Sequence, residues 1–363
     1  MATGPDRRVL GPFLGPDRNA FNLVRLCAAL SVIVSHAFVI VGGKGTAQPL
    51  ALLTPFTLGQ HAVNVFFVIS GLTVAASLDR NPDVLRFIAH RCLRIFPALF
   101  AFGLVFAFAI GPFVTASDLA AYFGSADTLA YPFAVPVLLS HAPAPEGVFL
   151  TAPLAGAANV PLWTIEYELL AYAGLATLFA LGLLRNGRVL VALIALCAAA
   201  LVGLRGAPDV LRMWSGALHP PLFGLTFLLG VAAYRWRDRV ALSPWLLALL
   251  LAAAVALGGT AVGPVAYVAL AAYGALYLGT LPMGALARWT RHTDVSYGTY
   301  IYGWPVQQTL VVIFPGWGLV PLTCAALVAA PLAGLLSWTI VEKRALALKK
   351  RLPAFRTAAA AAS

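Results

Sequence analysis

The stretch that decides the fold is FNLVRLCAALSVIVSHAF (residues 21–38), an apolar run that contains one arginine, Arg25, and one histidine, His36. A helix needs about 20 such residues to cross a bilayer. His36 comes eleven positions after Arg25, and eleven steps of about 100° return almost to the starting direction, so both side chains are expected on one stripe, roughly 16 Å apart. Because ionisable groups at membrane depth are costly and usually functional, the stretch predicts chemistry inside a bilayer.

The composition of the whole chain is that of an integral membrane protein. Of 363 residues, 61% are hydrophobic and only 10% are charged, whereas soluble domains are about 25% charged. Apolar runs of membrane-spanning length recur along the chain. The sequence therefore predicts an all-α, polytopic membrane helix bundle of about ten transmembrane helices. We place them at residues 20–41, 57–78, 97–114, 161–184, 188–204, 217–235, 243–260, 263–281, 295–314 and 319–341.

The basic loops between these spans indicate the orientation of the bundle. With the N-terminus in the cytoplasm, a predicted loop from Arg80 to Arg94 and most other basic residues lie inside, and only Lys44, Arg205 and Arg212 lie outside. The positive-inside rule then predicts that both termini are cytoplasmic. The net charge of +11 follows from this topology, so it does not indicate a nucleic-acid partner.

Three parts follow from this topology. They are a cytoplasmic N-terminal segment (1–19), a membrane domain (20–341) and a basic cytoplasmic tail (342–363). Within the membrane domain, residues 112–160 form a long outward loop whose apolar piece, residues 129–141, is too short to span a bilayer. That piece is either a re-entrant or interfacial element over an outward-facing cavity, or a surface loop that rests on the bundle.

Cysteine and histidine spacing predicts no metal site. The cysteines stand singly, and no two histidines have the spacing of metal ligands. The four cysteines are Cys27, Cys92, Cys197 and Cys324.

Two acids in the fourth predicted span are candidate partners of His36. Glu166 and Glu168 lie within PLWTIEYELLAY (161–172), and Glu168 is about as far from the outer end of its helix as His36 is from that of its own. A carboxylate beside an imidazole raises the histidine pKa and orients the ring, as in a general base. The alternative is a purely structural His–Glu pair. Residues two apart point in different directions on a helix, so periodicity does not choose between the acids.

Three arginines are candidates for binding a phosphate-rich donor. Arg91 and Arg94 are three apart, hence on one face if their segment is helical, and arginine forks bind phosphate well. Arg25 lies about 16 Å from His36 along the helix, of the order of the pantetheine arm of coenzyme A. The alternatives are snorkelling of Arg25 to the cytoplasmic surface and plain membrane anchoring by Arg91 and Arg94.

These blocks, taken in order, resemble the acyltransferase 3 membrane proteins, which O-acylate bacterial surface carbohydrates and some secreted small molecules. The basic residue and histidine of the first helix, the pattern GQHAVNVFFVISGL (59–72), the arginine pair before Pro97 and the tryptophan-to-glutamate motif that ends at Glu168 carry the resemblance. DVSYGTYIYGWPVQQ (294–308) and SWTIVEKR (337–344) are similar to the last two helices of the family. Glu166 is an extra acid, and Arg344 stands where proline is more common.

The resemblance implies a co-substrate and an acceptor. The donor is acyl-CoA, most often acetyl-CoA, with no metal, and the acceptor is a hydroxyl of a glycan, including a lipid-linked one. It implies a multi-pass protein of the bacterial inner membrane. His36 acts as general base or takes the acyl group transiently, Glu168 or Glu166 orients it, and Arg25, Arg91 and Arg94 bind the donor. Because aromatic faces and amides suit sugars, the candidate acceptor-binding residues are Gln60, His61, Asn64, Trp163, Tyr167 and Tyr172. The alternative for each is anchoring at the membrane interface or helix packing.

Two other functions compete with this interpretation. A transporter that exports a glycan or lipid intermediate without covalent change also needs charges at membrane depth, but it does not account for the arginine pair, histidine and glutamate in this order. A non-catalytic scaffold in an envelope-polysaccharide assembly predicts that His36 and Glu168 are replaceable. The sequence indicates no particular oligomeric state.

Overall fold

The structure, a computed structural model, describes residues 8–15 and 17–351. The regular structure of these residues is helical, and two isolated β-bridges accompany it. The outer parts of the predicted N-terminal segment and basic tail, with Arg7 and Arg356, lie outside the described residues.

The chain forms two compact units. The first unit comprises Met1–Ala28, Leu50–Val84 and Leu170–His292. The second unit comprises Ala29–Pro49, Leu85–Leu169 and Thr293–Ser363. Three helices, α1, α3 and α6, begin in one unit and end in the other, and of α3 only Val84 belongs to the first unit.

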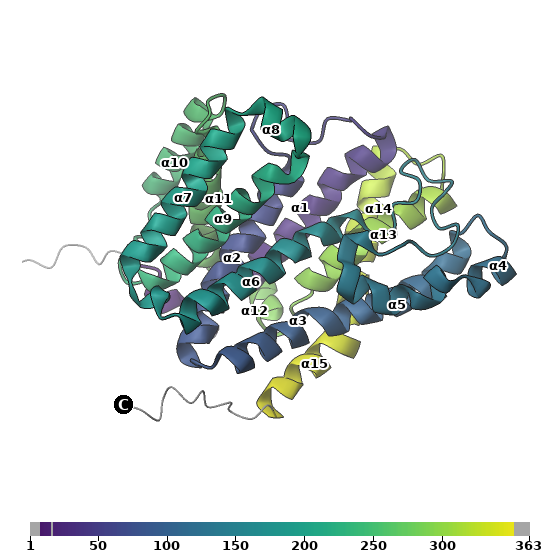
Figure 1. The fold of residues 1–363 in the computed structure, drawn as a ribbon, viewed down its shortest axis with the longest axis horizontal. Coiled ribbons are helices and arrows are strands. Elements are labelled where there is room, and N and C mark those ends of the chain that lie inside the picture. Colours follow the sequence, from purple (N-terminus) through teal and green to yellow (C-terminus); the bar gives the residue numbers. More distant parts are fainter. Residues whose placement is uncertain (1–7, 16, 352–363) are drawn as a thin grey trace, which may run out of the picture. The chain divides into compact units, whose positions relative to one another are not determined.

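A helix covers each of the ten predicted stretches. The main helices are α1 (Phe21–Gly42), α2 (Leu58–Arg80), α3 (Val84–Val105), α6 (Trp163–Ala180), α7 (Gly187–Arg205), α9 (His219–Arg235), α10 (Pro244–Leu257), α11 (Gly263–Gly279), α13 (Ser296–Ile313) and α14 (Leu319–Ser337). Shorter helices are α4 (Leu119–Gly124), α5 (Ala126–Leu138), α8 (Pro208–Met213), α12 (Gly284–His292) and α15 (Lys343–Ala347) (Figure 1).

Fewer of these helices qualify as membrane spans on their own. Among the described residues, six helical runs are long and apolar enough to cross a membrane; the pair α11 and α12, bent by 97°, is either a broken seventh span or a re-entrant loop. The all-helical membrane architecture is confirmed, while the number of ten crossings and the cytoplasmic termini stay predictions.

The predicted loop between Arg80 and Arg94 is wrong from Val84 onward. There α3 begins, and it continues through a π-helix (Phe106–Ile110) to form one helical run of 30 residues up to Phe113. The arginines of this segment lowered its hydropathy and hid the helix from the sequence pattern. The predicted span begins at Pro97, because proline is favoured in the first turn of a helix. In the structure Pro97 lies inside α3.

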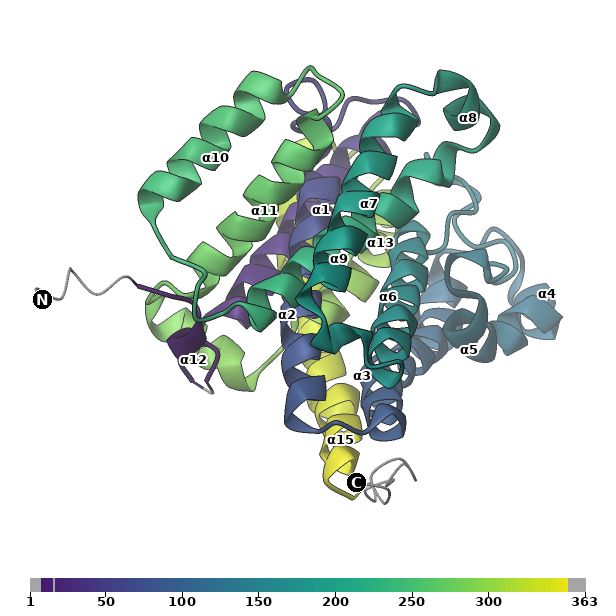
Figure 2. The same ribbon diagram turned by 60° about the vertical axis from the view of Figure 1, so that its left-hand side comes forward.

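The first unit is built on the close packing of α2 against α9. A Cβ atom added to Gly71 would lie 2.0 Å from the Phe227 carbonyl oxygen, and one added to Gly230 would lie 2.1 Å from that of Val68. Glycines of this kind let two membrane helices touch through their backbones. Figure 2 shows the neighbouring α7, α9, α10 and α11 of this unit.

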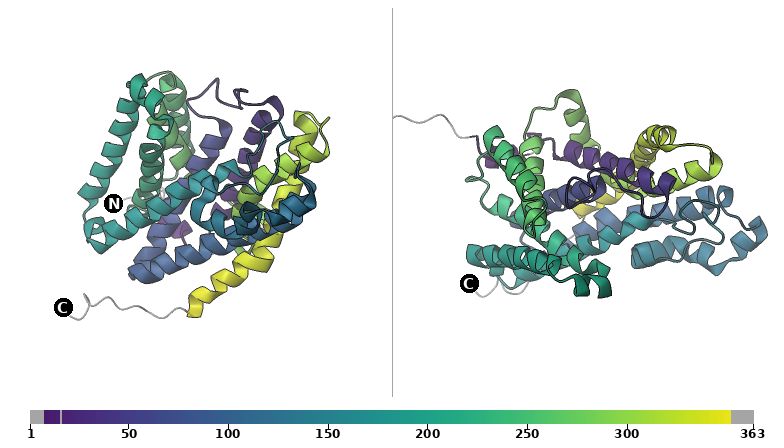
Figure 3. Two further views of the ribbon diagram at one scale, coloured as in Figure 1. Left: turned by 45° about the vertical axis from the view of Figure 1, so that its right-hand side comes forward. Right: turned by 90° about the horizontal axis from the view of Figure 1, so that it is seen from above.

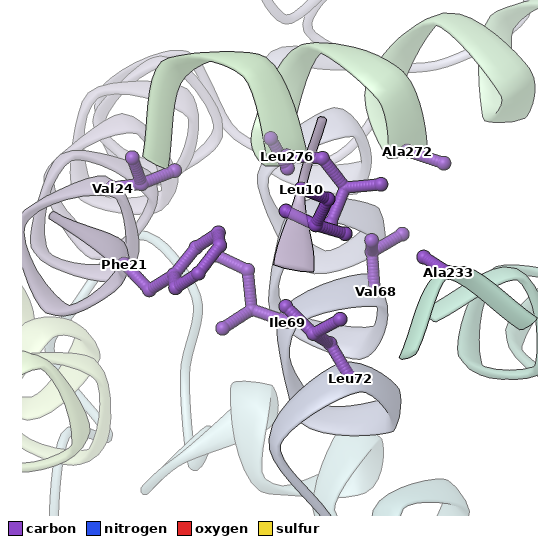
Figure 4. Close-up of a cluster of buried hydrophobic side chains, with 10 residues drawn as sticks. Leu10, Phe21, Val24, Val68, Ile69, Leu72, Ala233, Ala272 and Leu276 are labelled. Carbon is purple, nitrogen blue, oxygen red and sulfur yellow. The ribbon is translucent and has the colours of Figure 1, made fainter. Parts of the chain in front are cut away.

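An apolar cluster completes the core of the first unit. It joins the start of α1 to α2, α9 and α11 and includes Leu10 from the chain before α1 (Figure 4). Its members include Phe21, Val24, Val68, Ile69, Leu72, Ala233, Ala272 and Leu276.

The second unit is organised around α13 and α14. Gly298 and Gly334 bring these helices together, because a Cβ atom on Gly334 would lie 2.6 Å from the Thr299 nitrogen. From Leu319 the chain runs as one helical stretch through a π-helix (Trp338–Glu342) and α15 to Arg351, drawn in yellow in Figure 3.

The outward loop predicted over 112–160 contains its own helices, α4 and α5. The predicted apolar piece forms the greater part of α5, which includes Pro132 and Pro136, and a following 3-10 turn, Leu139–His141. The Tyr122 hydroxyl of α4 donates to the Ala107 carbonyl in the π-helix at 2.7 Å. Burial raises the pKa of Tyr122 to about 12, so the hydroxyl stays protonated and able to donate at neutral pH.

Candidate active site

His36 lies in the part of α1 that belongs to the second unit, and its ring contacts Trp304 of α13. The two rings meet edge to face, with centroids 5.2 Å apart and an interplanar angle of 82°. One turn before His36, the Ile33 carbonyl accepts a hydrogen bond from Gln307 Nε2 at 2.8 Å. The helical turn that carries the histidine is therefore fixed to α13 by one ring contact and one hydrogen bond.

The same helix also holds the chain that leads into α6. Three side chains, four residues apart and hence on one stripe of α13, donate to backbone carbonyls there. Tyr300 donates to Pro161 at 3.0 Å, Trp304 Nε1 to Ala157 at 2.8 Å and Gln308 Nε2 to Leu154 at 3.0 Å. The segment between Leu154 and Pro161 consists largely of turns, so these bonds supply the order that a helix or strand would give.

The two acids of α6 have different neighbours. Glu166 accepts a hydrogen bond from Ser140 Oγ at 3.1 Å, and its Oε1 lies 3.5 Å from Nε2 of His141. Glu168 lies within electrostatic range of the Tyr300 hydroxyl, on the same stripe of α13 as Trp304. Glu166 is thus bound to the outward segment.

The two arginines of the predicted pair, Arg91 and Arg94, also have different neighbours. Arg94 is ion-paired with Asp294 at 2.6 Å and with Glu342 at 3.2 Å. The Arg91 guanidinium lies over the ring of Phe87, one turn earlier on α3, at 5.8 Å. Both arginines share a helix as expected, but two carboxylates balance the charge of Arg94.

In the first unit, the Arg25 guanidinium lies over the Phe66 ring at 5.8 Å. Phe66 is the ninth of the 23 residues of α2. Donor binding by Arg25 and snorkelling of its side chain to the cytoplasmic surface both stay predictions.

Asn64 is fully buried, and both polar atoms of its amide lack a hydrogen-bond partner among the described residues. Leaving a buried polar group unpaired costs about 1–3 kcal/mol. Such groups in a folded protein require an explanation, and a functional role is one of the established ones.

The remaining predicted acceptor residues have structural contacts. His61 Nε2 lies 2.9 Å from Thr54 Oγ1, and the Tyr172 hydroxyl lies 3.0 Å from Ser70 Oγ. Gln60 completes the capping box at the start of α2. The rings of Trp163 and Tyr167 pack edge to face, 5.7 Å apart.

Sequence reasoning did not assign four residues of this site: Asn159, Trp304, Gln307 and Gln308. The signal available was the polar pair Gln307-Gln308 inside an apolar helix, which is a weaker mark than a charge at the same depth. In the part of the chain that the structure describes, no group of three His, Cys, Asp or Glu residues is arranged to hold a metal ion.

Comparisons with known proteins show which family the chain resembles over its length. Residues 18–342 match the acyltransferase domain of the acyltransferase 3 family. The chain is 31% identical to an O-acetyl transferase of Shigella phage Sf6, over 90% of this chain and 96% of that protein. It is 30% identical to nodulation protein 10 of Rhizobium leguminosarum bv. viciae, over 94% and 97% of the two chains. No solved structure matches this chain significantly.

Proposed function

The chain belongs to the acyltransferase 3 family, and we propose that it moves an acyl group, most simply acetyl, from cytoplasmic acyl-CoA to a hydroxyl of a cell-envelope or exported carbohydrate. A relative over nearly the whole chain is named an O-acetyl transferase, which supports acetyl as the group transferred. The apolar helices support a multi-pass membrane protein, and we place it in the bacterial inner membrane.

The observation that carries the proposal is the fixed position of His36 against Trp304. We propose His36 as the general base. It takes the proton of the acceptor hydroxyl while that oxygen bonds to the thioester carbonyl carbon. The carbon–sulfur bond then breaks, and the proton passes from His36 to the sulfur. The products are the carbohydrate ester and free coenzyme A. General base catalysis of this kind contributes about 10²–10⁴ in rate.

Of the two acids, we propose Glu168 as the one that orients His36. Ser140 and His141 engage Glu166, whereas Glu168 lies within electrostatic range of Tyr300, four residues before Trp304 on α13. Glu166 then serves to attach the outward segment to α6.

We propose Arg91 as the direct ligand of the donor phosphates, because arginine is suited to bidentate phosphate recognition. Arg25 is a second candidate, since it shares the unbroken helix α1 with His36. Arg94 acts through its ion pairs with Asp294 and Glu342, which fix the part of α3 that carries Arg91.

On the acceptor side we propose Asn64 as a ligand of the carbohydrate. Its buried amide offers one acceptor and two donors that the described residues leave unused. A hydroxyl group is both donor and acceptor, so it satisfies either end of the amide.

The experiment that tests this function is mass spectrometry of envelope glycans from cells with and without the protein. We expect one additional ester per modified sugar, of 42 Da if the group is acetyl, and its loss in a His36→Ala strain with equal protein in the membrane. Glycan that changes its location without gaining an ester would instead identify a transporter.

A further inference from the structure

Three buried amides of the second unit use their nitrogens and leave their oxygens without a partner. Asn159 Nδ2 donates to the Ile301 carbonyl at 2.9 Å, and Gln307 and Gln308 donate to carbonyls as described above. Within the described residues, the oxygens of these amides accept no hydrogen bond, although the three side chains are 0–6% exposed. Each unpaired buried acceptor lowers the stability of the fold, and three such acceptors occur here.

The orientation of these amides is determined by their surroundings. Turning Gln308 over would set its oxygen against the Leu154 carbonyl oxygen, and turning Gln307 over would set its oxygen against that of Ile33. Two acceptors cannot form a hydrogen bond. The nitrogens are therefore held against the backbone, and the oxygens are kept as acceptors only.

All three amides lie near the turn of α13 that carries Trp304, the residue whose ring contacts His36. Gln307 and Gln308 are three and four residues after Trp304, so they adjoin it on the surface of α13. Asn159 lies two residues after Ala157, whose carbonyl accepts from the Trp304 indole. Leu154, Trp304 and Ala37, the residue after His36, belong to one buried apolar cluster.

We propose that Asn159, Gln307 and Gln308 form a subsite that recognises the hydroxyl groups of a neutral carbohydrate acceptor beside His36. A ligand that fits must bring hydrogen-bond donors and no negative charge, because acceptor oxygens repel carboxylate and phosphate. Sugar hydroxyls meet this requirement. The inference rests on the proposed function and adds the class of acceptor and the residues that select it.

The test measures transfer from labelled acetyl-CoA by the full-length protein in proteoliposomes. The acceptor is de-O-acetylated envelope polysaccharide from the expressing cells, counted in hexose equivalents. Variants Gln307→Met and Gln308→Met keep the side-chain length and remove the amide. We expect each to raise the KM for polysaccharide about tenfold, the effect of one lost hydrogen bond, with the KM for acetyl-CoA within about twofold of wild type.

Two further variants separate recognition from packing. Gln308→Glu keeps an acceptor oxygen, since a carboxyl group buried there stays protonated, and we expect it to restore the polysaccharide KM to within about threefold. Thr309→Val removes another unpaired buried oxygen from a different face of α13, and it should leave both KM values unchanged. If either Gln307→Met or Gln308→Met does not fold, the KM for polysaccharide is measured with the remaining Met variant and with Asn159→Leu.

The possible outcomes show separately whether the subsite proposal or the proposed function fails. An unchanged polysaccharide KM in the folded Met variants, or a Gln308→Glu variant that behaves like Gln308→Met, would overturn the subsite while wild-type transfer upholds the function. Absence of any transfer by the wild-type protein would overturn both.

Discussion

Replacing Arg94 by glutamine should destabilise the protein far more than the same change at Arg91. The Arg94 guanidinium lies 2.6 Å from Asp294 and 3.2 Å from Glu342. The side chains of Arg94 and Asp294 are 12% exposed and that of Glu342 only 1%. After the substitution, Glu342 still accepts a hydrogen bond from the Ser337 hydroxyl at 2.9 Å, but it loses its ion pair with Arg94.

The size of the effect follows from this burial. Removing one partner of a buried ion pair lowers the free energy of unfolding by about 3–5 kcal/mol. At roughly 2 °C per kcal/mol for a chain of this size, the apparent Tm should fall by about 6–10 °C. Adding Glu342→Gln to Arg94→Gln removes the carboxylate that has lost its ion pair with Arg94. The double variant should therefore be more stable than Arg94→Gln alone, by about 1–3 kcal/mol.

The assay is thermal unfolding of the purified protein in detergent, followed by tryptophan fluorescence and by loss of the monodisperse peak. Arg91→Gln is the matched control on the same helix, and its Tm should stay within about 2 °C of wild type while its KM for acetyl-CoA rises. The reasoning is refuted if Arg94→Gln shifts the Tm by less than about 2 °C, or if Arg91→Gln destabilises the protein as much.

Three further tests by substitution address other parts of the account. Asn64→Leu should leave the free energy of unfolding unchanged or higher by up to about 1–3 kcal/mol, because it removes an unpaired buried amide, while acceptor turnover falls; lower stability with normal turnover would contradict this. Gly230→Ala should cost about 1–3 kcal/mol or more at its contact with α2, whereas Gly203→Ala, which meets open space, should cost nothing; equal Tm values would refute the close packing. Glu168→Gln should lower kcat about 100-fold and Glu166→Gln less than about threefold; the reverse order would exchange their roles.

Most helices could be predicted because their apolar runs are long enough to cross a bilayer. The start of α3 could not, because the arginines of Val84–Phe96 gave it the hydropathy of a loop. The bend of 97° between α11 and α12 was also invisible, since it depends on tertiary packing around a short connection and not on the hydropathy of either helix.

In the candidate site, the sequence points to the charged residues and to Asn64, but not to the neutral residues of α13 or to Asn159. His36 and Glu168 stand out because charge at membrane depth is rare. Gln308 and Trp304 do not, since their importance lies in which backbone carbonyls they reach. The ion pairs of Arg94 join residues that are 200 and 248 positions apart, a separation over which one sequence holds no pairing signal.

The central claim is that the protein transfers an acyl group from acyl-CoA to a carbohydrate hydroxyl, with His36 as the general base. Its most direct test is the rate at which wild-type and His36→Gln proteins, matched in amount and Tm, move label from acetyl-CoA to the de-O-acetylated polysaccharide in proteoliposomes. The account predicts transfer by the wild type and a loss of at least about 100-fold in the variant. Equal rates for the two proteins would contradict it.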